Sequence, residues 1–178
     1  MPMKYSLLLL MLLPLAFSAQ SECRLVASQH SVSWGTINAA ERQTAGSKPV
    51  ELPEKSLQLN INCDEAQRVR LFFNSAMPHN NTFALGSQGQ MRFTALKATV
   101  DDREVLLAPV RTPDSVLSSS GTQQAAITLN EGIAFVSGDE VRGKNIALTV
   151  AVVGHFKNEA ITEKVNYHGN LLIKVDAQ

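Results

Sequence analysis

Cys23 and Cys63 are the two residues of this sequence whose type and placement indicate covalent chemistry. They are the only cysteines among 178 residues. Cys63 closes the segment 56–63, in which polar and apolar residues alternate strictly, and Cys23 opens the short apolar segment 23–27. A period of two predicts a strand with one buried face, because successive side chains point to opposite faces. Two cysteines on apolar strands of an exported chain predict one disulfide.

The other reactive side chains do not form the pattern of an active site or a metal site. Residues 86–89 lack the spacing of a serine-nucleophile elbow, and residues 46–48 lack the first glycine of a phosphate-binding loop. Asp101 and Asp102 are adjacent, so in a strand they would face opposite ways, and a polar turn is the better interpretation. The four histidines stand singly, without the spacing of metal ligands: His30, His79, His155 and His168. The sequence predicts no enzyme, no metal and no cofactor.

The first eighteen residues have the features of a signal peptide. Lys4 supplies the positive start, residues 7–15 are apolar, and Ala16 and Ser18 fit the small-residue positions of a cleavage site. The apolar run is shorter than the roughly 20 residues that span a membrane. We therefore expect an exported chain in which 1–18 is removed and 19–178 forms one domain.

The charge of the chain is balanced, with 16 basic and 16 acidic residues. Loss of Lys4 with the signal peptide leaves a net charge of about −1 when histidine is neutral. No run of like charges follows. Nucleic acid is therefore not an expected partner, because its recognition rests on clustered basic residues.

Strand-like segments recur along the chain, separated by turns rich in glycine, proline, asparagine and aspartate, and none shows a sustained helical period. This spacing is typical of an all-β, immunoglobulin-like sandwich. A hairpin is predicted around residues 130–132. The predicted strands are 23–27, 32–35, 56–63, 69–74, 91–96, 103–107, 126–129, 133–136, 145–156 and 170–175.

Residues 23–63 resemble the fimbrial subunits of the chaperone–usher pathway. The resemblance rests on the opening Cys23, on Trp34 followed by Gly35, and on the pattern Leu-Pro-x-Lys-x-Leu-x-Leu-x-Ile-x-Cys that ends at Cys63. Asp64 directly follows the second cysteine, and in this respect the chain resembles a divergent group of fimbrial-like proteins most. The resemblance continues, more weakly, to the last predicted strand.

This resemblance implies a pilin-type sandwich that lacks its final strand and is completed by β-augmentation. A periplasmic chaperone, and later another fimbrial subunit, would insert a strand into a hydrophobic groove between the first and last strands. An outer-membrane usher and a host receptor would be further partners, and the chain would pass from the periplasm to a cell-surface fimbrium involved in adhesion. The implied groove residues are Leu25, Ala27, Leu57, Leu59, Ile61, Ile146, Leu148, Val150, Leu171, Ile173 and Val175.

Two features differ from typical pilins. The last strand lacks the usual penultimate tyrosine, and the nearest tyrosine is Tyr167. At most residues 19–22 remain before Cys23 after cleavage, since residues 19–21 offer a second cleavage site, and four residues reach about 13 Å, less than a strand needs. We therefore expect a subunit that accepts a strand but donates none, as at the tip of a fibre. The alternative is a monomeric exported β-sandwich with a complete fold that acts as a binding module.

Overall fold

The computed structural model describes residues 22–28, 31–36, 48–76, 78, 81–86, 89–117, 120–157 and 166–178. The predicted signal peptide lies outside these residues. The described part contains no helix that is long and apolar enough to cross a membrane. Its strands are β1 (Cys23–Ala27), β2 (Ser31–Thr36), β3 (Val50–Glu51), β4 (Lys55–Asn74), β5 (Phe83–Leu85), β6 (Gly89–Val100), β7 (Arg103–Val110), β8 (Ala125–Ile127), β9 (Gly132–Ser137), β10 (Asp139–Glu140), β11 (Arg142–Phe156), β12 (Asn166–Asn170) and β13 (Leu172–Ala177).

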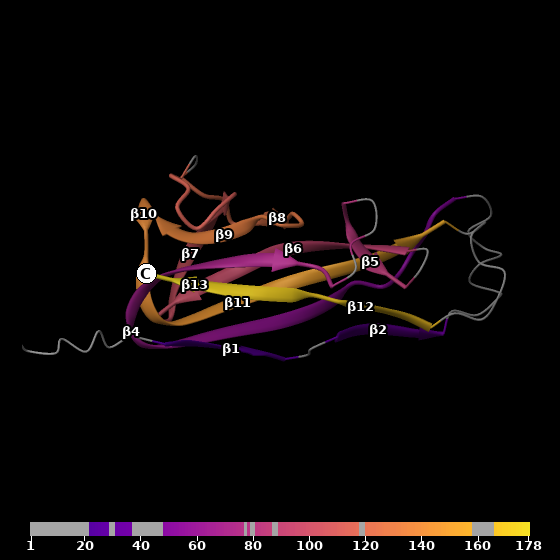
Figure 1. Ribbon diagram of the computed structural model, residues 1–178, viewed down its shortest axis with the longest axis horizontal. Helices are drawn as coiled ribbons and strands as arrows, with labels where there is room; N and C mark the ends of the chain where they lie inside the picture. The colour runs from indigo at the N-terminus through magenta and orange to yellow at the C-terminus, as the bar shows by residue number, and fades with distance from the viewer. Residues whose placement is uncertain are drawn as a thin grey trace, which may run out of the picture.

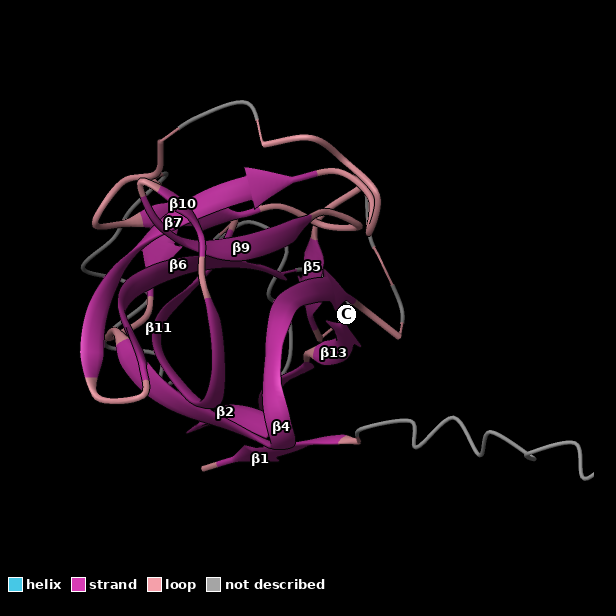
Figure 2. Cartoon of the chain, turned by 90° about the vertical axis from the view of Figure 1, so that its left-hand side faces the viewer, coloured by secondary structure: helices cyan, strands magenta, loops and turns pink. Residues whose placement is uncertain are grey.

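Strand β4 is the longest element described, with 20 residues. Its odd-numbered residues are buried from Leu57 to Cys63 and again from Gln67 to Phe73, so the same side of the strand faces the interior throughout. The two strands predicted at 56–63 and 69–74 are therefore one. End-on, β4 curves from beside β1 up to the opposite side of the molecule (Figure 2).

The bend of β4 makes it a member of two layers (Figure 1). Its first part pairs with β1 and β11, and β11 pairs in turn with β6. Its second part pairs with β13 and β9. Strand β7 bonds to β6 at its start and to β9 further along, so β4, β11, β6, β7 and β9 form a closed ring.

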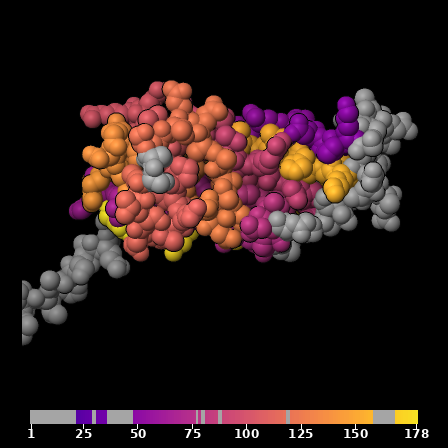
Figure 3. All heavy atoms as spheres, turned by 90° about the horizontal axis from the view of Figure 1, so that it is seen from above, coloured from indigo at the N-terminus to yellow at the C-terminus, as the bar shows by residue number. Residues whose placement is uncertain are grey.

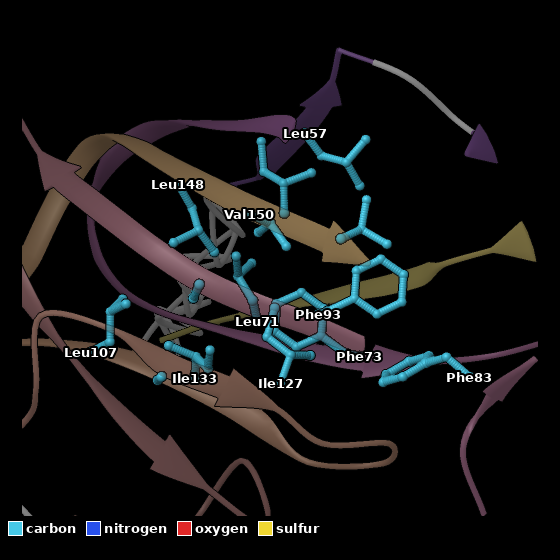
Figure 4. Close-up of a cluster of buried hydrophobic side chains, with 14 of the residues drawn as sticks. Leu57, Leu71, Phe73, Phe83, Phe93, Leu107, Ile127, Ile133, Leu148 and Val150 are labelled. Carbon is cyan, nitrogen blue, oxygen red and sulfur yellow. The ribbon is translucent and has the colours of Figure 1, made fainter. Parts of the chain in front are cut away.

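The core lies between these layers and is apolar. Leu71 and Leu148 are fully buried, and Leu148 and Val150 point from β11 toward the opposite layer (Figure 4). Phe83 and Phe93 pack edge to face with ring centroids 4.8 Å apart, a geometry that aromatic pairs prefer. The prediction that residues 145–156 form a strand with one apolar face is confirmed.

The turn at Asp101 and Asp102 is confirmed as a polar hairpin turn. Both residues have positive φ, 46° and 64°, as a two-residue type I′ turn requires. The Asp101 carboxylate accepts hydrogen bonds from the backbone N–H groups of Lys144 and Asn145, at 3.1 and 2.9 Å. These bonds hold the irregularity in β11, where the register with β4 shifts between Gly143 and Asn145.

The prediction of a hairpin around residues 130–132 is wrong, because β8 and β9 do not pair with each other. Asn130 does have positive φ, but β8 pairs with β6, while β9 pairs with β7 and β4. The segment between β8 and β9 therefore crosses between layers. In the view from above, the residues of β7 to β10 and their loops gather at one end of the elongated molecule (Figure 3).

The prediction of an all-β chain with one disulfide is confirmed. The finer assignment to an immunoglobulin-like, pilin-type sandwich stays a prediction, because a closed ring of five strands is compatible with more than one all-β architecture.

Candidate functional site

The first wall of the candidate site is β1. It runs antiparallel to β4, with Cys23 opposite Cys63 and Ala27 opposite Leu59. The predicted disulfide is confirmed: the two sulfurs are bonded and the Cα atoms lie 4.0 Å apart. At the other end of β1, the Ser28 N–H donates to the Gln58 carbonyl at 2.8 Å. Strand β1 is therefore fixed to β4 at both ends.

The second wall is β13, which pairs with the other half of β4. Leu172 lies opposite Asn74 and Ala177 opposite Val69. The pairing continues to Gln178, whose N–H and carbonyl both bond the backbone of Arg68, each at 2.9 Å. Because β4 bends between the two pairings, β1 and β13 lie in different layers.

The space between β1 and β13 holds no strand of the described chain, although the two strands approach each other in places. In the described part of the chain, β4 is the only strand with which either of them pairs. Their inward-facing residues are only half buried, although they pack against the core: Cys23, Leu25, Ala27, Ile173, Val175 and Ala177. The inward residues of β4 and β11, which have neighbours on both sides, are almost completely buried.

One end of this opening is an apolar hollow of about 220 Å³. Its walls come from β1 and from the start of β13, and its floor comes from β4. The hollow could hold one or two apolar side chains. It is lined by Leu25, Ala27, Ser31, Val32, Leu57, Leu59, Leu171, Leu172 and Ile173.

The other end is a polar hollow of about 630 Å³, beside the disulfide and the bend of β4. Carboxylate, guanidinium and amide groups meet at this end. It is lined by Glu22, Cys23, Glu65, Ala66, Gln67, Arg142, Val175, Ala177 and Gln178. We call the two hollows together the β1–β13 groove.

Seven of the predicted groove residues lie in this groove. Leu25, Ala27, Leu57, Leu59, Leu171 and Ile173 line the apolar hollow, and Val175 lines the polar one. The other four need a correction, because they lie in the closed core, where β11 and the adjoining part of β4 are covered by the opposite layer. These four are Ile61, Ile146, Leu148 and Val150, each no more than 3% exposed.

Sequence reasoning missed the polar end of the groove. Arg142 starts β11 and lies far from both walls in sequence, so nothing local placed it beside Cys23. Ala177 could have been predicted as a groove residue, because it follows Ile173 and Val175 at the same spacing of two residues. Leu172 was missed because its side chain lies at the rim, 49% exposed.

The described residues contain no group of three or more His, Cys, Asp or Glu that could hold a metal ion. His155 lies on β11, where burial lowers its pKa and the nearby Arg92 lowers it further. His168 lies exposed on β12, while His30 and His79 lie outside the described residues. The groove offers strand edges for hydrogen bonding, apolar side chains at one end, and charged and amide groups at the other.

The fold and the groove define a class: an all-β, disulfide-bonded protein with an uncovered gap between its first and last strands. The chain is 30% identical to the uncharacterized protein YhcE of Escherichia coli (strain K12) over 173 residues, 94% of this chain and 96% of the relative. It belongs to the same family as YhcE. No protein-family model and no solved structure matches the sequence.

Proposed function

We propose that this chain is a non-enzymatic subunit of a chaperone–usher fimbria, with an incomplete immunoglobulin-like fold that accepts a strand from a partner. One observation carries the proposal: the inward apolar residues of β1 and β13 are only partly buried, whereas those of the strands that lie between other strands are almost completely buried. A strand inserted between β1 and β13 would cover them and continue both layers.

The edges of β1 and β13 support this proposal. An exposed strand edge is a template for pairing with another chain, and proteins normally cover or interrupt such edges. In the β1–β13 groove two edges flank a strip of apolar side chains. An incoming strand can therefore form backbone hydrogen bonds on both sides while its alternate side chains enter the groove.

The proposal names the partners. In the periplasm the inserted strand belongs to a chaperone, and in the fibre it belongs to another subunit delivered by an outer-membrane usher. A disulfide indicates an oxidising, exported location, and the cell surface is the proposed destination, with adhesion to a host receptor as the role.

Co-expression with a chaperone of this class tests the proposal. The chain should co-purify with the chaperone, and hydrogen exchange should slow at the amides of β1 and β13. Leu25→Asn, which places an amide on the groove side of β1, should reduce co-purification. The control is Val26→Asn on the adjacent outward position, where the side chain is 50% exposed. Equal co-purification by both variants, or protection elsewhere, would contradict the proposal.

A second candidate function is a monomeric exported binding module. The observation that favours it is the direct pairing of β2 with β12, which closes the molecule beyond the groove. A chain of this kind would be exported in soluble, monomeric form without a chaperone. The strand-accepting subunit should instead be poorly soluble alone, because open edges beside apolar side chains aggregate.

A further inference from the structure

The opening between the first and last strands stops abruptly. Past Ala27 and before Leu172 the chain continues into β2 and β12, and these two strands are hydrogen bonded to each other. Ser31 lies opposite Asn170, and Ser33 lies opposite His168. Figure 1 shows β2 and β12 side by side beyond the ends of β1 and β13. No inserted strand can pass between them while this pairing holds.

Strand β2 is fixed in place by side-chain contacts. Val32 is 2% exposed and belongs to the core. The Trp34 Nε1–H donates to the Pro53 carbonyl at 2.8 Å. The Lys55 ammonium donates to the Ser33 carbonyl at 2.7 Å and lies 5.9 Å from the centre of the Trp34 ring.

Strand β12 is fixed as well. Gly169 is buried against Met91, at a position where a Cβ atom would lie 2.1 Å from the methionine Cε. The Gly86 N–H donates to the His168 carbonyl at 3.0 Å. The β2–β12 pair therefore blocks one end of the groove, and we call this pair the stop. The bend of β4 lies at the other end.

Between these two ends the walls are short: β1 has five residues and β13 has six. At about 3.3 Å per residue, that length accommodates roughly five residues of an extended chain. The two ends also differ in chemistry, with leucine and isoleucine at the Ala27 end and charged or amide side chains at the Cys23 end.

We infer that the β1–β13 groove takes a short extended segment of about five residues, with apolar side chains at the Ala27 end and a polar side chain at the Cys23 end. This inference rests on the proposed function and specifies its partner. The apolar residues of the segment enter the hollow floored by Leu57 and Leu59. Its polar residue meets Glu22 and Arg142, because an apolar group there would cover their charged groups without giving them a hydrogen bond.

A cross-link between β2 and β12 tests the length. Ser33→Cys with His168→Cys joins two exposed residues that face each other in the pairing, and mass spectrometry identifies the new disulfide beside the native one. The probe is a labelled peptide with alternating residues, apolar at its first and third positions and asparagine at its fifth, made in both sequence directions. Its affinity is measured by fluorescence anisotropy.

Cross-linked and parent proteins should bind this peptide with equal affinity, and a peptide twice as long should bind no more than about threefold tighter. If cross-linking lowers the affinity for the peptide about tenfold or more, then β2 must separate from β12 when the peptide binds. That result would overturn the short groove but would leave the strand-accepting function intact. Binding by neither protein would overturn the proposed function itself.

The position of the apolar side chains is tested by Ala27→Trp, which fills the apolar hollow. It should weaken peptide binding about tenfold or more, while Val26→Trp, facing outward on the same strand, should not. A peptide with leucine in place of its asparagine should also bind more weakly; tighter binding would overturn the polar end. Thermal melting of each variant identifies losses that come from misfolding.

Discussion

Arg70 and Glu140 form a two-bond ion pair on the outer side of β4. The Arg70 Nε and Nη2 atoms donate to the two carboxylate oxygens of Glu140 at 2.7 and 2.8 Å. The remaining Nη1 donates to the carbonyls of Thr112, Pro113 and Ser115. The hydrogen bond that Arg70 donates to the Glu140 carboxylate raises the pKa of Arg70. One side chain thus holds the loop after β7 against the second layer.

Removing this pair should destabilise the protein strongly. Arg70 is 3% exposed, so Arg70→Met leaves three carbonyls without their donor and leaves the partly buried Glu140 carboxylate with only the longer contact to Arg68, at 3.7 Å. We expect a loss of about 3–5 kcal/mol in the free energy of unfolding, measured by urea denaturation. Arg92→Met is the control, because its ion pair with Glu51 is well exposed and should be worth about 1 kcal/mol or less. Equal losses would contradict a structural role for Arg70.

The Asp101 carboxylate should stabilise the fold in a pH-dependent way. Hydrogen bonds from the Asn145 and Lys144 backbone lower its pKa, so the stabilisation is present above the unfolded value of about 3.9 and is lost as pH falls through the folded value. Asp101→Gly keeps the positive φ but should cost about 1 kcal/mol at pH 7, since water screens this exposed group.

The control for Asp101 is Asp102→Gly, at the neighbouring position with the same left-handed backbone. It should not lower stability, because glycine adopts positive φ freely. Denaturation of both variants at pH 7 and near pH 2 separates the two effects. If Asp101→Gly lowers the free energy of unfolding by the same amount at both pH values, the charged carboxylate is not the cause of the loss.

The disulfide should hold the first wall of the groove. Replacing both Cys23 and Cys63 by serine should lower the free energy of unfolding by roughly 3–4 kcal/mol, on the chain-entropy account of a loop this long. It should also speed hydrogen exchange along β1. The control pair is Arg24→Ser with Asn62→Ser, the next register partners, which face outward. Two free thiols in periplasmic protein would contradict the bond.

The strands that could be predicted from sequence are those with one face in the core. Leu57 and Leu59 on β4 alternate with polar residues because water lies on the other side, and on β11 large apolar residues such as Leu148 and Val150 alternate with small or polar ones. The same alternation placed Cys63 on the inner face, which made the disulfide predictable. These signals are local, so a single sequence contains them.

The pairing partners could not be read in this way. The exposed residues Asp64, Glu65 and Ala66 interrupt the alternation, so β4 looked like two strands although its backbone continues through the bend. Ile61 and Ile146 show the same pattern as Leu57, yet only the opposite layer decides which positions are covered. The β2–β12 pairing joins segments more than a hundred residues apart, so no local pattern encodes it.

The stop at the end of the groove should depend on the close approach of Gly169 to Met91. In Gly169→Ala the new Cβ atom would meet the Met91 Cε and Sδ atoms at 2.1 and 2.5 Å and the Ala84 carbonyl at 2.9 Å. Overpacking of this kind costs about 1–3 kcal/mol. Strand β12 should move outward, and hydrogen exchange should speed at the amides that pair β12 with β2.

Met91→Ala isolates the contact with Met91, because it removes the two closest of the three atoms that the new methyl group meets and leaves the Ala84 carbonyl in place. Alone it should be destabilising, since it leaves a cavity in the core. Combined with Gly169→Ala it should cost less than the sum of the two single changes, by about 0.5 kcal/mol or more. Thermal and urea denaturation of the four proteins give this coupling. Strictly additive losses would mean that β12 is held by its pairing with β2 and not by its packing on Met91.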